Sequence, residues 1–359
     1  MSGRRAVGDE AGWALLARAP EVRVAGIVDG RPIVRSMHGV VVDGRLWLHG
    51  VPRGTVASLG GGPVQIQADE VVARIPSHFR DPERACPATT YYRSVLADGV
   101  ATAETDPAVK AAVLQRMMEQ RQPEGGHLPI DPAHPLYAAA VRGLGVWSVE
   151  LRSLSAVEKL GQDQTAAHVR GILGGLWRRG GSGDLAAIEA ISDAHPERPR
   201  FVELPSGVPE GLVPRCHPSD ADVDAAAALA APAYWNGGMS RDQLADAVRS
   251  SVAWVGLARD GVLVATARAI SDRAKRSWVY DVVVADGLQR SGVGTALIGL
   301  LLDHPAVRGT EINLATRDAM AFYARFGFGE VFVDRSGAYP RTTMARPRPT
   351  VSPTLTAGR

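Results

Sequence analysis

The chain has 359 residues, a length at which two domains are the usual arrangement, and a formal net charge of +2. Its 45% hydrophobic and 22% charged residues are typical of a soluble globular protein. The basic residues form no cluster, so nucleic acid is not an expected partner. No apolar run nears the roughly 18 residues of a membrane helix, the N-terminus is too polar for a secretory signal, and the two cysteines have no metal-binding spacing. We therefore expect a cytoplasmic protein without a membrane partner.

Residues 22–104 are predicted to form short strands, because segments rich in Val and Ile alternate with turn signals. The Asp-Gly pairs at 29–30 and 43–44 predict tight hairpins. Strands at this spacing favour an all-β barrel over an alternating βαβ sheet. A helix is expected over 107–120, with Asp106 as its N-cap, followed by a Pro-rich loop and a strand over 145–154.

Two more helices are predicted at 164–178 and 184–193, and a linker at 194–200. A second pattern of elements comes after this linker. It begins with a short strand at 201–204 and two helices at 220–235 and 240–251. A hairpin is expected around Asp260-Gly261, then a buried strand at 278–285, a helix at 292–304, a strand at 311–315, a helix at 318–328 and a last strand. We accordingly predict domains at 1–195 and 196–348 and a disordered tail at 349–359.

The strongest chemical signal is a glycine-containing turn between the predicted strand 278–285 and the helix after it. Gln289-Arg290-Ser291-Gly292-Val293-Gly294 opens that helix. Unpaired N–H groups and the helix dipole favour an anion there, and glycine lets the main chain approach a phosphate closely. The turn is not a P-loop, because no Gly-Lys-Ser/Thr follows, and its glycine spacing does not fit a dinucleotide fingerprint.

This turn has the Q/R-x-x-G-x-G/A pattern, and INLATRDAMAFYARFGF follows it in the expected order. On both motifs, residues 200–348 resemble the GCN5-related N-acetyltransferase superfamily, whose fold is α+β. The resemblance implies acetyl-CoA as cosubstrate, with Val282 and Val284 bonding the pantetheine arm and Asn313 lying where two strands part beside the cofactor. It assigns the diphosphate to the turn, namely to Gln289, Arg290, Ser291, Gly292, Val293, Gly294 and Thr295.

The same resemblance implies direct attack of a neutral amine on the thioester. Tyr323 occupies the position of the general acid, with a packed core aromatic as the alternative. Asp281 either acts as a base, directly or through water, or orients a cationic amine, or is a strand carboxylate bonded to backbone. Tyr280, Trp235 and Trp254 either line the acceptor pocket or belong to the core.

The first domain is similar, over about residues 20–165, to the FMN-binding split-barrel superfamily, in its pyridoxamine-phosphate-oxidase-like and nitroimidazole-resistance-like branches. DGRPIVRSMHGVVVDGRLWLHGVPRG and the later YYRSV carry the likeness. Arg53, Thr55 and Ser58 offer a phosphate site, to which Arg35, Arg74 and Arg93 add if they face the same side. Lys159 and Gln162 match a "KLSQ" stretch of related members, although Gly161 replaces its serine.

His38 and His49 lie on neighbouring predicted strands, as flavin contacts, as haem ligands or as ordinary barrel residues. The family's usual lysine-rich phosphate site is missing, so an empty barrel is a third reading. The resemblance implies a homodimer through the split barrel.

Three functions follow. The first is an N-acetyltransferase for a small amine or amino-acid-like substrate, fused to a flavin-binding barrel. The second is a bifunctional natural-product enzyme with a haem-dependent barrel, active in N–N bond formation or related nitrogen chemistry. The third is a cofactor-sensing regulator with a vestigial transferase.

Overall fold

The computed structural model describes residues 4–53, 57–196, 207–336 and 340–349. The chain divides into two compact units. The N-terminal unit comprises Met1–Ile75 and Ala88–Gln164, and the C-terminal unit comprises Pro76–Pro87 and Thr165–Arg359. No helix in the described ranges has the length and apolar character needed to cross a membrane.

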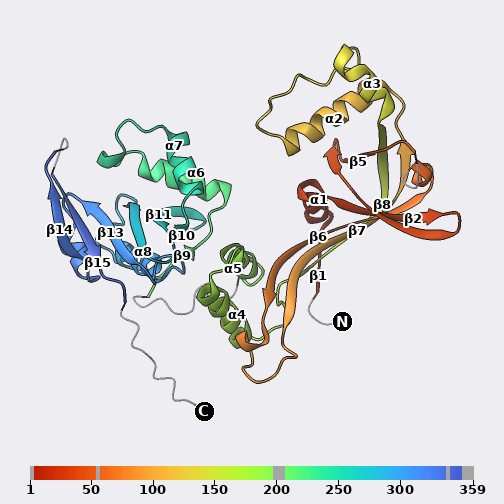
Figure 1. The fold of residues 1–359 in the computed structure, drawn as a ribbon. Helices are drawn as coiled ribbons and strands as arrows, with labels where there is room; N and C mark the ends of the chain where they lie inside the picture. The colour runs from red at the N-terminus through yellow and green to blue at the C-terminus, as the bar shows by residue number, and fades with distance from the viewer. Residues whose placement is uncertain (1–3, 54–56, 197–206, 337–339, 350–359) are drawn as a thin grey trace. The chain divides into compact units, whose positions relative to one another are not determined.

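The N-terminal unit is built on an eight-stranded antiparallel sheet that curves like a barrel (Figure 1). The strands run in the order β3-β2-β6-β7-β8-β5-β4, with β1 paired to β8, and no ladder among the described residues joins β3 to β4. The predicted hairpins are confirmed, because Asp29-Gly30 and Asp43-Gly44 have positive φ and connect paired strands. The strands are β1 (Arg5–Val7), β2 (Val22–Val28), β3 (Arg31–Met37), β4 (Gly39–Val42), β5 (Arg45–Gly50), β6 (Pro63–Ile75), β7 (Thr89–Ala103) and β8 (Gly145–Lys159).

Three helices complete this unit. The predicted helix is confirmed as α2 (Pro107–Arg121), capped by the Asp106 carboxylate, which accepts a bond from the Ala108 N–H at 2.8 Å. Two further helices, α1 (Asp9–Arg18) and α3 (Pro135–Gly143), lie in segments without a predicted element. Helix α1 buries Leu15 and Leu16 in the core of the sheet, so its formation depends on tertiary packing as much as on sequence pattern.

The C-terminal unit contains a seven-stranded sheet in the order β14-β15-β13-β12-β11-β10-β9. Every pairing is antiparallel except that of β12 with β13. The predicted order of elements is confirmed from residue 220 onward, with two closing strands in place of one, while the strand expected at 201–204 lies outside the described residues. The strands are β9 (Val213–Arg215), β10 (Ala253–Arg259), β11 (Val262–Ser271), β12 (Arg276–Val284), β13 (Glu311–Thr316), β14 (Gly329–Asp334) and β15 (Arg341–Arg346).

Helices cover this sheet. α6 and α7 share a core cluster with Trp254 of β10 and Leu263 of β11, and α8 is almost entirely apolar and buried. The helices are α6 (Asp220–Ala230), α7 (Arg241–Arg249), α8 (Val293–Asp303) and the short α9 (Met320–Ala324). The architecture is thus an all-β barrel-like domain with helices and a mixed α/β domain, as expected.

The helices α4 (Ala166–Arg179) and α5 (Asp184–Asp193) pack within the C-terminal unit. The Trp177 Nε1–H donates to Asp303 at the end of α8 at 2.7 Å, and the Trp177 ring meets His304 edge-on. The Cys216 N–H donates to Glu189 of α5 at 2.7 Å. Sequence composition placed these helices before the linker, but composition does not reveal which surface a helix buries. Part of that linker, 197–200, lies outside the described residues.

Replacing Trp177 by alanine should destabilise the C-terminal unit by about 3 kcal/mol, since it removes a buried aromatic side chain and leaves Asp303 without its donor. Differential scanning calorimetry should show a lower Tm for the transition of the C-terminal unit and an unchanged Tm for that of the N-terminal unit. Phe332→Ala is the matched control, because Phe332 is an aromatic residue of the same unit that is 62% exposed and should cost at most about 1 kcal/mol. Equal losses for both variants would contradict the proposed packing role.

Candidate functional site

The C-terminal sheet opens between β12 and β13. These parallel strands are paired only from Arg276–Glu311 to Trp278–Asn313, yet β12 runs on to Val284 and β13 to Thr316. From that point the edge of β12 that faces β13 has no strand partner among the described residues. Asn313 is the last residue of β13 that pairs with β12, at the point where the sequence placed it, and Val282 and Val284 lie on the stretch of β12 that has no partner on β13.

A bulge in β12 sharpens this opening. The register against β11 shifts between Thr266 and Arg268, and Asp281 adopts a positive φ of 48°. Such a conformation is uncommon for a residue with a side chain and is held in place here by tertiary contacts. The bulge redirects the strand at the residue that sequence analysis singled out as a candidate base.

The Asp281 carboxylate is held by three donors. Arg268 Nε lies 2.6 Å from Oδ2, in an ion pair whose side chains are 12% and 8% exposed. Trp235 Nε1 and Asn236 Nδ2 donate to Oδ1 at 2.9 and 3.1 Å. The negative charge is therefore already matched by a guanidinium, and the carboxylate is fixed in direction. These three contacts are with side chains, whereas the structural alternative predicted from the sequence had the carboxylate bonded to backbone.

The turn after β12 leads into α8 as expected. Gly292, the N-cap of α8, has φ 89°, and Arg290 has φ 62°. The first backbone bond of the helix runs from the Ala296 N–H to the Gly292 carbonyl, so the amides just before it are not used by the helix. The side chains of Gln289 to Gly292 are exposed, while Val293 is buried and anchors the helix start. This arrangement presents N–H groups and the positive end of the helix dipole to solvent.

Tyr323 on α9 is buried, at 8% exposure, and its ring lies edge-on to Phe322 and Phe328. Burial, with smaller contributions from Tyr234 and Asp318, raises the pKa of Tyr323 to about 12. The phenol consequently stays protonated and available as a donor at ordinary pH.

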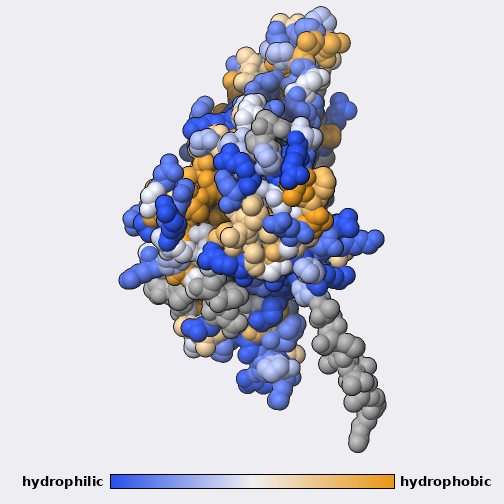
Figure 2. Space-filling view, turned by 90° about the vertical axis from the view of Figure 1, so that its left-hand side faces the viewer, coloured by the Kyte–Doolittle hydropathy of each residue, from blue (hydrophilic) through white to orange (hydrophobic). Residues whose placement is uncertain are grey.

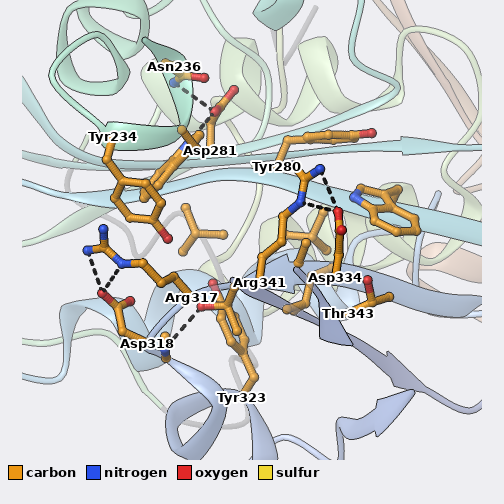
Figure 3. Close-up of a pocket in the computed structure, with 18 of the residues that line it drawn as sticks. Tyr234, Asn236, Tyr280, Asp281, Arg317, Asp318, Tyr323, Asp334, Arg341 and Thr343 are labelled. Atoms are coloured by element: carbon orange, nitrogen blue, oxygen red, sulfur yellow. Dashed lines mark hydrogen bonds and ion pairs between the residues drawn. The ribbon is translucent and has the colours of Figure 1, made fainter. Parts of the chain in front are cut away.

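A cavity of about 700 Å³ lies beside the bulge in β12 and Tyr323 (Figure 3). Asp281, Val282 and Tyr323 line it, and Tyr234, Tyr280 and Tyr323 point toward it in Figure 3. Among the candidate acceptor residues, Tyr280 and Trp235 line the cavity, whereas Trp254 is a core residue whose Nε1–H donates to Thr266 at 2.9 Å. Sequence reasoning missed five cavity residues, of which only Arg317 lies within a quoted motif, where no role was assigned to it, and which the fold brings together: Tyr234, Arg268, Arg317, Asp334 and Arg341.

In the N-terminal unit, hairpin pairing brings His38 and His49 together. Gly39 faces Leu48 across the β4–β5 ladder, and the two imidazole centroids lie 5.5 Å apart. His49 Nδ1 is buried and has no hydrogen-bond partner among the described residues. Burial, together with the nearby charges of His38 and Arg121, lowers the pKa of His49, which favours the neutral imidazole.

The other predicted barrel residues do not gather around this pair. His49 faces Val146 on β8, whereas Arg93 faces Glu158 near the far end of that strand, about 40 Å along it at 3.3 Å per residue. Arg93 is paired with Glu70 and Glu158, and Lys159 donates to Thr89 at 2.6 Å. Arg53 is exposed, as are Arg35 and Arg74, Thr55 lies outside the described residues, and the side chain of Ser58 is not described.

Comparison with known proteins agrees with this division. Residues 8–157 match the family model of pyridoxamine 5'-phosphate oxidase, and residues 222–328 match that of the acetyltransferase (GNAT) family. A search of the curated proteins found no match.

Three solved structures illustrate the similarity of each part of the chain to known proteins. The flavocytochrome Anf3 from Azotobacter vinelandii is 19% identical over 43% of this chain and 68% of its own, with a TM-score of 0.35. The FAD and heme binding protein from Mycobacterium smegmatis is 17% identical over 44% and 74%, with a TM-score of 0.35. The ribosomal-protein-S18-alanine N-acetyltransferase from Escherichia coli is 22% identical over 40% and 99%, with a TM-score of 0.34.

Both resemblances inferred from the motifs are therefore confirmed by the family matches. The chain joins a pyridoxamine 5'-phosphate oxidase-like domain at its N-terminal end to a GNAT acetyltransferase domain at its C-terminal end.

Proposed function

We propose that the C-terminal domain transfers the acetyl group of acetyl-CoA to the nitrogen of a small amine. The observation that carries this proposal is the parting of β12 and β13 directly beside the exposed start of α8. A strand edge without a partner offers main-chain bonds to a pantetheine arm, and the amides of residues 290–295 offer an anion site for the diphosphate. The strand edge reaches the cavity, which both Val282 and Tyr323 line.

In the proposed reaction the neutral amine attacks the thioester carbonyl. A carbon–nitrogen bond forms, the carbon–sulfur bond breaks, and the nitrogen loses one proton to solvent. The phenol of Tyr323 gives its proton to the departing sulfur and recovers one from water. Asp281, already bonded to Arg268, Trp235 and Asn236, acts as a positioning residue that fixes the wall of the cavity.

Tyr323→Phe should lower kcat strongly, by about a hundredfold, while the Kd of acetyl-CoA stays nearly unchanged, because only the proton donor is removed. In the parent protein kcat should rise as the amine deprotonates and should not fall up to about pH 10, the pKa of an ordinary tyrosine, because that of Tyr323 is raised to about 12. Assays of the free thiol released at each pH measure kcat, and calorimetry measures the Kd of acetyl-CoA. Equal losses of rate and affinity would mean that Tyr323 only packs.

Gly292→Ala should weaken acetyl-CoA binding about tenfold, because φ 89° is strained for alanine and relief of that strain moves the amides at the start of α8. Gly287→Ala is the matched control, since Gly287 has φ 81° in the same connection but precedes the proposed diphosphate site. It should lose similar stability and keep its affinity. A parallel loss of affinity in both variants would show that strain alone is responsible.

For the N-terminal domain, Arg93 lies far along β8 from His49, and Thr55 and the side chain of Ser58 lie outside the described residues, so no step is assigned to a flavin. We propose instead that the His38–His49 pair marks its cofactor site, because a buried Nδ1 without a partner calls for a donor or a metal. Haem, held through an imidazole, fits that chemistry and would supply redox or nitrogen chemistry when bound. We also propose that the domain pairs with a second copy.

Freshly purified protein should show a Soret band that His49→Ala removes without unfolding the domain. A flavin spectrum, or a colourless protein that stays colourless with added haem, would contradict this assignment.

Light scattering of the same sample tests the proposed homodimer. Acetyl-CoA binding without turnover of any amine would favour the regulatory alternative.

A further inference from the structure

The cavity beside Asp281 collects large apolar side chains that the fold leaves exposed. They come from three separate segments of the C-terminal unit, and each is between 36% and 62% exposed. Figure 2, which turns the side carrying β14 toward the viewer, shows hydrophobic side chains among hydrophilic ones on this face. Exposed apolar groups that converge on one hollow are typical of a ligand site. The residues are Tyr234, Trp235, Met239, Tyr280 and Phe332.

Charge in the cavity is present but matched. Arg268 pairs with Asp281, Arg317 with Asp318 and Arg341 with Asp334, and Figure 3 shows the latter two pairs at the wall. Two nitrogens of Arg341 reach the same Asp334 oxygen at 2.9 and 3.0 Å. A polycationic acceptor would need surplus carboxylates, and a phosphorylated acceptor would need surplus guanidiniums. These pairings provide neither.

Two of the aromatic rings already carry a cation. The Arg317 guanidinium lies 3.9 Å from the Tyr234 centroid, and that of Arg268 lies 4.9 Å from the Tyr280 centroid. These stacks fix the rings and use one face of each for cation–π attraction. The Tyr234 ring is also held edge-on against Trp235 at 4.8 Å. The wall is thus a stiff aromatic surface suited to an apolar body, since an incoming ammonium would meet rings that already bear positive charge.

We infer that the acceptor is a primary amine carried on an aromatic or bulky aliphatic body with no further charge. This inference rests on the proposed N-acetyl transfer and names its substrate class. The amine lies toward Tyr323, and the apolar body lies between the η3 turn (Tyr234–Asn236) and Phe332 of β14.

The test compares 2-phenylethylamine, ethylamine and spermidine as acceptors with the full-length protein and acetyl-CoA. Burial of an aromatic group should give 2-phenylethylamine a kcat/KM at least about tenfold above that of the other two. Phe332→Ala should lower kcat/KM for 2-phenylethylamine about fivefold, mainly through KM, and leave the values for ethylamine and acetyl-CoA unchanged. Val331→Ala is the matched control, because Val331 is 66% exposed on the same strand and does not line the cavity.

A preference for spermidine, or equal effects of the two variants on 2-phenylethylamine, overturns the inference while the proposed N-acetyl transfer stands. Acetyl-CoA binding with no turnover of 2-phenylethylamine also overturns it. Failure of the folded protein to bind acetyl-CoA in calorimetry is a different result, which removes the proposed function and the inference with it.

Discussion

The short ladder between β12 and β13 is the constraint on which the acetyltransferase domain depends. Three residue pairs hold the strands together and then they part, so main-chain groups that a continuous sheet would consume stay available. The backbone also departs from regular geometry near this opening, at the bulge at Asp281 and at the left-handed residues Arg290 and Gly292. Each of these conformations turns the chain where a regular strand or helix would continue. The opening therefore has a structural origin in specific backbone conformations.

Around this opening, polar groups are balanced within the protein. The largely buried Arg268–Asp281 pair fixes the carboxylate at the bulge, while Trp235 and Asn236 connect it to the turn after α6. Tyr323 is kept neutral by burial beside this network. Such an arrangement limits reorganisation when a neutral acceptor enters, since the charged groups already have their partners.

Much of this was predictable from sequence. The strand–turn–helix at residues 278–304 and the FYxxxGF segment carry local signals, because glycine spacing and apolar periodicity are properties of a few adjacent residues. The Asp-Gly hairpins and the Asp106 cap follow the same logic, whereas the position of Asn313 was implied by the family resemblance.

Other features have no local signal. Arg268, Arg317 and Arg341 lie in three separate parts of the chain and line one cavity because of the sheet topology. Residue type alone does not reveal that Trp254 is a core residue whereas Trp235 lines the cavity. Sequence likewise grouped Arg93 and Lys159 with His49, because residue type does not reveal that a 15-residue strand separates them. Helix α1 was missed because its short apolar stripe gains stability from the sheet that it covers.

The central claim is that main-chain amides at residues 290–295 bind the diphosphate of acetyl-CoA. Hydrogen–deuterium exchange of the full-length protein with and without acetyl-CoA tests it most directly, because these amides lack helical partners and should exchange quickly in the free protein. Binding at these amides should give marked protection confined to this turn and to the stretch of β12 beyond Trp278, which has no partner on β13. Unchanged exchange at residues 290–295 in the presence of saturating acetyl-CoA would contradict it.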